Sequence, residues 1–388
     1  MKDIRIIECN CLKEQLIPTI SELLKAGHIT LVKDVFARID AAEIITKAGY
    51  PCTVLEINKG ALFDYNAVAS KLVKEESRLV VAIGGLDCIE SGKVIAGIAG
   101  LPLLMIPTSF NALCCLWKRA EFFCCDTLVT YNYQGSAAVL FGYDILSDKR
   151  ADIPAAMGFL LAYLVLAFDM LYEGLLHNKG IDNDLQRLIG AIKNALIKLT
   201  KAESAEVSEI VIATAADIAR TLFERARLGT ANSLAWFISL YKRRESAYTD
   251  YSFIAAYTVI KLYLAAPSGL NMLLPTDRDM TFLEIEKRCG LSYRQELRAA
   301  KIGYAKDYNR RDFVTADYLA ELKALLLGDY LTIAARRYRR HVGSCGYNMH
   351  KLINCGELLR LAALSSEAAE GYPLIKHLKL SGILDRYI

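Results

Sequence analysis

The sequence lacks the short signatures of several common enzyme classes. Its 388 residues include only five histidines, and none lies between His177 and His341. No Cys-x-x-Cys pair occurs among the eleven cysteines, which disfavours a zinc ribbon or a thioredoxin-type site. Gly-x-Ser-x-Gly and P-loop motifs are also absent, which disfavours a serine hydrolase and a P-loop kinase. Candidate functional residues must therefore be identified from other patterns in the sequence.

An excess of one charge is missing as well. The 47 Lys and Arg residues nearly balance the 43 Asp and Glu residues, for a net charge of +4. Nucleic-acid binders usually carry a larger positive charge gathered on one face, so we expect no nucleic-acid partner. Residues 1–8 hold no apolar run of the kind that opens a signal peptide. With free, buried thiols typical of a reducing compartment, these features predict a cytoplasmic protein.

Long apolar runs are scarce in the chain, although hydrophobic residues make up 54% of it. The most apolar stretch, 153–168, is uncharged but shorter than the roughly 18 residues that a membrane span needs, and Asp169 ends it. We therefore predict a buried helix there and no membrane span. The high apolar content also predicts a homo-oligomer.

The first third of the chain alternates short aliphatic runs with helical patterns. The predicted strands are 29–32, 53–55, 79–83 and 103–106, and the predicted helices between them include 36–48 and 65–73. Continuous Val, Ile and Leu runs separated by amphipathic helices are typical of a parallel sheet covered on both faces. Such a sheet binds ligands at the carboxyl ends of its strands.

From Pro154 onward the strand signals disappear and helical patterns dominate. A cluster of Asp, Lys and Arg at 147–153 precedes this change. We predict an α/β nucleotide-binding-like domain over 1–152 and an all-helical domain over 153–388.

A glycine pair follows the predicted strand 79–83. Gly84-Gly85-Leu86 leads into a predicted helix that begins near Cys88. Backbone N–H groups of such a turn, at a helix N-terminus, can surround a phosphate. A simple tight turn between strand and helix is the alternative interpretation.

The residues around this turn resemble a known family. Gly84 and Gly85 are followed by Glu90 and Lys93, and a second strand then ends in Pro-Thr-Ser at 107–109. This order and spacing resemble the iron-dependent alcohol dehydrogenase superfamily, which includes glycerol dehydrogenase, glycerol-1-phosphate dehydrogenase and dehydroquinate synthase. The glycerol-1-phosphate dehydrogenase branch is the most similar. The resemblance implies a dehydroquinate synthase-like fold, and it is specific only around 79–109.

The resemblance also implies a cofactor site. It implies that the glycine turn holds the pyrophosphate of NAD or NADP, with Lys93 nearby and Thr108 and Ser109 beside the cofactor. Two positions depart from the family pattern: Leu86 replaces a third glycine, and Glu90 replaces an aspartate.

Asp34, after the first predicted strand, could accept hydrogen bonds from a ribose and so favour NAD. The alternative for Asp34 is a solvated helix cap.

The family's metal ligands have no counterparts in this sequence. Dehydrogenases of the family hold a divalent ion through one aspartate and two histidines. The corresponding positions are occupied by Phe159, Asn232 and Tyr248, in a register supported by Asp169. A further family aspartate near the substrate is replaced by Leu113. We therefore expect no divalent metal at this place. A magnesium site built from Asp217, Glu224 and Asp250 is the alternative.

These features predict a divergent NAD(P)-dependent oxidoreductase that resembles polyol or glycerol(-phosphate) dehydrogenases but lacks the usual metal site. Its partners would be a nucleotide and a polyol ligand. Lys93 and Tyr248 are the weak candidates for moving a proton. One alternative is a non-catalytic descendant that binds a nucleotide or a protein partner. Another is a cyclase related to dehydroquinate synthase, although that enzyme also needs a metal.

Overall fold

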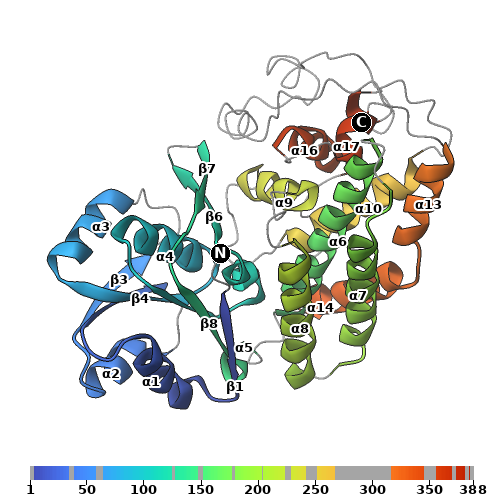
Figure 1. The fold of residues 1–388 in the computed structure, drawn as a ribbon. Helices are drawn as coiled ribbons and strands as arrows, with labels where there is room; N and C mark the ends of the chain where they lie inside the picture. Colours follow the sequence, from blue (N-terminus) through green and yellow to red (C-terminus); the bar gives the residue numbers. More distant parts are fainter. Residues whose placement is uncertain are drawn as a thin grey trace. The chain divides into compact units, whose positions relative to one another are not determined.

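A computed structural model describes most of the chain (Figure 1). It describes residues 4–34, 39–57, 64–124, 127–146, 152–176, 180–202, 204–222, 229–241, 251–266, 316–344, 355–368, 373–380 and 384. The chain forms two compact units, Met1–Asp152 with Glu203–Ala219, and Ile153–Ala202 with Arg220–Ile388. The first unit thus includes a segment that sequence analysis assigned to the helical half. The domain limits 1–152 and 153–388 stay a prediction.

The first unit is built on a six-stranded parallel sheet with the order β1-β8-β5-β4-β2-β3. Its strands are β1 (Arg5–Cys9), β2 (His28–Asp34), β3 (Cys52–Ile57), β4 (Ser77–Gly84), β5 (Leu103–Pro107) and β8 (Ala137–Gly142). A separate antiparallel hairpin consists of β6 (Arg119–Cys124) and β7 (Thr127–Asn132). The four predicted strands correspond to β2, β3, β4 and β5. The strands β1, β6, β7 and β8 were not predicted, and the side chains of β1 are largely exposed and include charged groups.

Helices cover both faces of this sheet, as predicted. The helices of the unit are α1 (Leu12–Leu23), α2 (Ala41–Lys47), α3 (Tyr65–Lys74), α4 (Leu86–Ala99), the 3₁₀ helix η1 (Phe110–Leu116), α5 (Tyr143–Leu146) and most of α8 (Ser204–Leu222). The aliphatic side chains of α1 and α2 pack against alternate residues of β2, β4 and β5 in one core cluster. On the opposite face α4 approaches closely, because a Cβ at Gly92 would lie 2.5 Å from Ala82 Cβ.

Among the described residues of the second unit, all regular secondary structure is helical. It contains α6 (Asp152–Leu176), α7 (Asn183–Leu199), α9 (Thr230–Tyr241), α10 (Ser252–Ala265), α13 (Ala316–Leu326), α14 (Tyr330–Ser344), α16 (Cys355–Ala368) and α17 (Leu374–Leu380). One stretch of α6, Ile153–Leu175, is long and apolar enough to cross a membrane, but most of it is buried inside the protein. A core helix passes the same test, and the buried helix predicted at 153–168 lies here.

Candidate nucleotide site

The glycine turn lies at the carboxyl end of β4, where three strands bring their ends together. Gly84 is the last residue of β4, Gly85 is the N-cap of α4, and Leu86 begins the helix. Gly84 pairs with Pro107 in the register of β4 and β5, and Thr108 N donates to Gly84 O at 3.0 Å. The structure therefore places Thr108 directly beside the turn.

Asp34 reaches the turn from the end of β2. Its Oδ2 accepts a hydrogen bond from Gly85 N at 2.7 Å. A Cβ at Gly85 would lie 3.5 Å from the same oxygen and 3.8 Å from Ser109 Oγ. Asp34, Gly84, Gly85, Thr108 and Ser109, all predicted for the cofactor, are thus neighbours. Their contacts with a cofactor stay a prediction.

The two glycines are required for different reasons. A Cβ at Gly84 would lie 2.6 Å from Asp34 Oδ2 and 2.7 Å from Cys88 Cβ, so only glycine fits at this position without a shift. A Cβ at Gly85 would make only ordinary contacts, and its φ of −77° and ψ of −167° are open to any residue. Among the residues that the structure describes, none therefore demands glycine at 85. A group that approaches the turn from outside would demand it.

Leu86 differs from the glycines in exposing its side chain. It is 44% exposed, although it is a large apolar residue in the first turn of α4. The Leu86 side chain therefore stands at the border of the turn, where the family pattern has no side chain.

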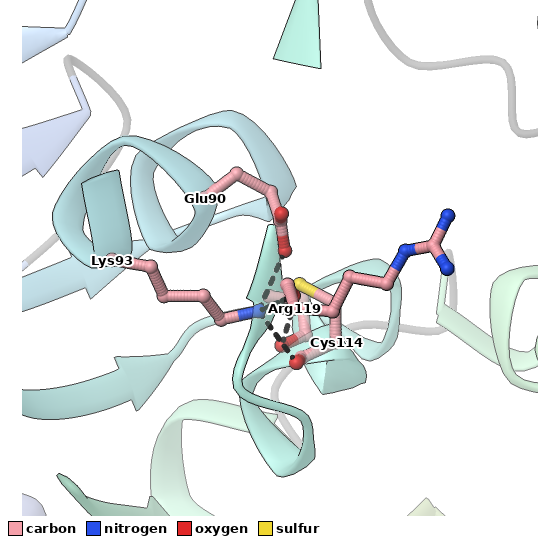
Figure 2. Close-up of polar contacts among 5 residues, drawn as sticks. Glu90, Lys93, Cys114 and Arg119 are labelled. Atoms are coloured by element: carbon pink, nitrogen blue, oxygen red, sulfur yellow. Dashed lines mark hydrogen bonds and ion pairs between the residues drawn. The ribbon is translucent and has the colours of Figure 1, made fainter. Parts of the chain in front are cut away.

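Glu90 and Lys93 lie on the buried side of α4, away from solvent. Lys93 Nζ donates to Glu90 Oε1 at 2.9 Å, to Cys114 O at 2.8 Å and to Arg119 O at 2.8 Å. Figure 2 shows the ammonium between these three acceptors, while the Arg119 guanidinium points away from it. The pair thereby ties α4 to η1 and to β6.

This arrangement makes Lys93 a poor proton acceptor. Burial is the largest single influence and lowers the pKa of Lys93, but the charge and hydrogen bond of Glu90 together with the neighbouring Cys114 and Cys115 raise the pKa above its ordinary value. All three ammonium protons already have acceptors. Removing one proton at neutral pH would leave Glu90 as an uncompensated charge, so the geometry favours a structural role over the predicted role in moving a proton.

The resemblance places metal ligands at three positions, of which Phe159 and Asn232 lie among the described residues of the second unit. Phe159 is buried and packs against the Tyr163 ring at 4.8 Å between centroids. Asn232 is half-buried on α9. Tyr248, Glu224 and Asp250 lie outside the described residues, whereas Asp217 lies on α8.

The side chain of Phe159 does not fit a divalent ion. Within the described part of the chain, no group of three or more His, Cys, Asp or Glu side chains is placed to hold one. The phenyl ring of Phe159 offers no lone pair to a cation. We therefore assign no metal ligands and derive no step that passes through a metal.

One buried polar network was missed by sequence analysis. Asp169, only 2% exposed on α6, accepts hydrogen bonds from Tyr263 Oη at 2.6 Å and from Thr230 Oγ1 at 2.9 Å. These contacts join α6, α10 and α9. The available signal was a single carboxylate at the end of the uncharged run 153–168, but its partners lie 61 and 94 residues away.

Comparison with known proteins identifies the fold. No protein-family profile matches the sequence, and no curated protein matches it. Among solved structures, an archaeal alcohol dehydrogenase from a Red Sea brine pool aligns with 100% of this chain and 98% of its own, at 13% identity and a TM-score of 0.60. Sulfoacetaldehyde reductase from Bifidobacterium kashiwanohense, solved with NAD+, aligns with 100% of this chain and 97% of its own, at 12% identity and a TM-score of 0.59.

An iron-containing alcohol dehydrogenase from Thermotoga maritima aligns with 99% of this chain and 98% of its own, at 9% identity and a TM-score of 0.58. The chain therefore has the fold of the iron-containing alcohol dehydrogenases. The predicted dehydroquinate synthase-like fold is confirmed.

Proposed function

We propose that this protein is a divergent NAD(P)-dependent oxidoreductase that acts on a polyol or a glycerol(-phosphate)-like alcohol without the usual metal site. The observation that carries the proposal is the glycine turn at the carboxyl ends of β4 and β5, with Asp34 and Thr108 against it. A ligand is expected at this edge of a parallel sheet. A protein with the same fold was solved in complex with NAD+.

The residues of the turn fit a dinucleotide in a simple way. The positive end of the α4 dipole would favour an anion beside the turn, where a pyrophosphate would bind. The absence of a Cβ at Gly85 leaves room for the phosphate to approach the backbone. Thr108 and Ser109 would supply hydroxyl groups beside the nucleotide, and Asp34 would accept hydrogen bonds from a ribose.

A bound nicotinamide would supply the hydride acceptor. The residues of the glycine turn would bind and orient the nicotinamide cofactor. Negative charge that develops on the substrate oxygen would need hydrogen-bond donors from residues outside this site. No catalytic base is assigned, because the Lys93 ammonium group already donates hydrogen bonds to three acceptors. Tyr248 stays a candidate. We also propose a cytoplasmic, homo-oligomeric protein.

The test is hydride transfer with both cofactors. The purified protein is mixed with NAD+ or NADP+ and with glycerol, glycerol phosphates and propanediols, and with the reduced cofactors and the matching carbonyl compounds. Nicotinamide absorbance reports turnover, and the Gly85→Ala variant serves as the control for background contaminants. Turnover that Gly85→Ala reduces supports the proposal, and its absence with all substrates at saturating cofactor contradicts it.

The second candidate is a non-catalytic nucleotide-binding descendant of the same fold. The saturation of Lys93 and the unsuitable side chains at the family's metal positions favour it. Calorimetric titration with NAD+, NADH, NADP+ and NADPH separates the two candidates. Binding without turnover supports the second, and absence of all binding contradicts both.

A further inference from the structure

The glycine turn already contains an anion that belongs to the protein itself. Asp34 Oδ2 lies 2.7 Å from Gly85 N, the N-cap amide of α4. Carboxylates that accept from backbone N–H groups at a helix N-terminus imitate a bound phosphate oxygen. The same oxygen lies 2.6 Å from the Cβ position of Gly84, so the carboxylate is seated against both glycines.

The negative charge of Asp34 also affects the pKa of a neighbouring thiol, that of Cys88. Burial raises the pKa of the Cys88 thiol, and the charge of Asp34 raises it further. Asp87 adds a second, exposed carboxylate in the first turn of α4. An incoming phosphate would thus meet like charge where the helix dipole alone would attract it.

From this geometry we infer that Asp34 is an internal competitor for the anion position of the glycine turn, and that it sets the affinity of the site for pyrophosphate-bearing ligands. The inference rests on the proposed nucleotide site. It gives Asp34 a role in addition to the predicted ribose contact. The ribose contact would strengthen nucleotide binding, whereas competition for the phosphate position would weaken it. If Asp34 only held a ribose, neutralising it would weaken nucleotide binding and leave phosphate binding unchanged.

The test uses a ligand that has phosphates but no ribose. Inorganic pyrophosphate is titrated calorimetrically into the wild type and into Asp34→Asn, whose amide oxygen can still accept from Gly85 N. We expect Asp34→Asn to bind pyrophosphate about tenfold more tightly, because one like charge within a few ångströms is removed. The gain should shrink in high salt. Glu14→Gln, an exposed carboxylate in the first turn of α1, is the matched control for net charge and should change the affinity little.

Titration of NAD+ into the same proteins separates this inference from the proposed function. If wild type binds NAD+ while Asp34→Asn binds pyrophosphate no more tightly than wild type, the inference is overturned and the nucleotide site stands. If Asp34→Asn binds pyrophosphate and wild type binds neither ligand, the inference stands and the wild-type nucleotide function fails. If no protein binds either ligand, both are overturned. Circular dichroism confirms that each variant is folded.

Discussion

Gly84 and Gly85 are adjacent residues of one type with different physical tasks. The first is glycine because Asp34 and Cys88 leave no space for a Cβ. A Cβ at Gly85 would meet no such obstacle. Glycine at this position therefore indicates that a ligand outside the protein approaches the backbone here. Lys93 is the reverse case. It was expected near the ligand, but its ammonium group donates to three acceptors inside the protein.

Alanine at each glycine should separate these tasks. Gly84→Ala should lower the free energy of unfolding by about 1–3 kcal/mol, because the new methyl group is overpacked. Gly85→Ala should leave stability nearly unchanged but weaken NAD+ binding, because its methyl group obstructs the pyrophosphate. Denaturant unfolding and calorimetric titration measure the two effects. Equal stability losses in both variants would contradict this assignment.

Replacing Lys93 by methionine should be strongly destabilising. The change leaves the buried Glu90 carboxylate without its cation, and removing one partner of a buried pair costs about 3–5 kcal/mol. Denaturant unfolding gives the value. Lys71→Met is the matched control, since Lys71 and Glu75 form a pair at the surface with side chains 56% and 30% accessible. That variant should change stability by less than about 1 kcal/mol. A Lys93→Met protein as stable as wild type would show that the buried pair contributes nothing.

At the scale of elements, polar contacts between distant helices organise the second unit. Thr230 on α9 and Tyr263 on α10 both donate to Asp169 on α6. The last described helix, α17, is joined to α6 in a similar way, because His377 Nδ1 lies 2.7 Å from Tyr172 Oη in a fully buried contact. Each contact connects helices that the chain brings together only on folding.

The buried imidazole should make stability depend on pH. Burial lowers the pKa of His377 from 6.5 to about 4, so between these values the unfolded chain binds a proton that the folded chain refuses. The second unit should therefore lose about 3 kcal/mol of stability as the pH falls through this window, and keep full stability above it. Denaturant unfolding at a series of pH values measures the slope. His377→Gln should remove much of that slope, and an unchanged slope would contradict the assignment.

At the scale of the whole molecule, the chain has the fold of the iron-containing alcohol dehydrogenases, while the buried ring of Phe159 stands where the resemblance places a metal ligand. The likeness to the Thermotoga maritima and Red Sea dehydrogenases extends over almost the whole chain. The described residues nevertheless offer no cluster of His, Cys, Asp or Glu for a cation.

Metal removal should leave this protein unaffected. Elemental analysis of the purified protein should find iron, zinc and nickel far below one ion per chain, and prolonged dialysis against EDTA should leave Tm unchanged. The physical reason is that a specifically bound ion stabilises the folded state by mass action, and none is expected. One equivalent of metal, together with a fall in Tm on its removal, would contradict this expectation.

The sequence by itself determined the parallel sheet, the helical second half and the glycine turn. Aliphatic runs, helical spacing and a Gly-Gly pair after a strand are local signals that neighbouring residues carry together. Only the tertiary structure decided the roles of individual side chains. It turned Lys93 toward the carbonyls of Cys114 and Arg119, seated Asp34 against Gly85, and joined Asp169 to Thr230 and Tyr263. These partners lie between 21 and 94 residues apart, and no local pattern specifies which distant groups a buried charge will meet.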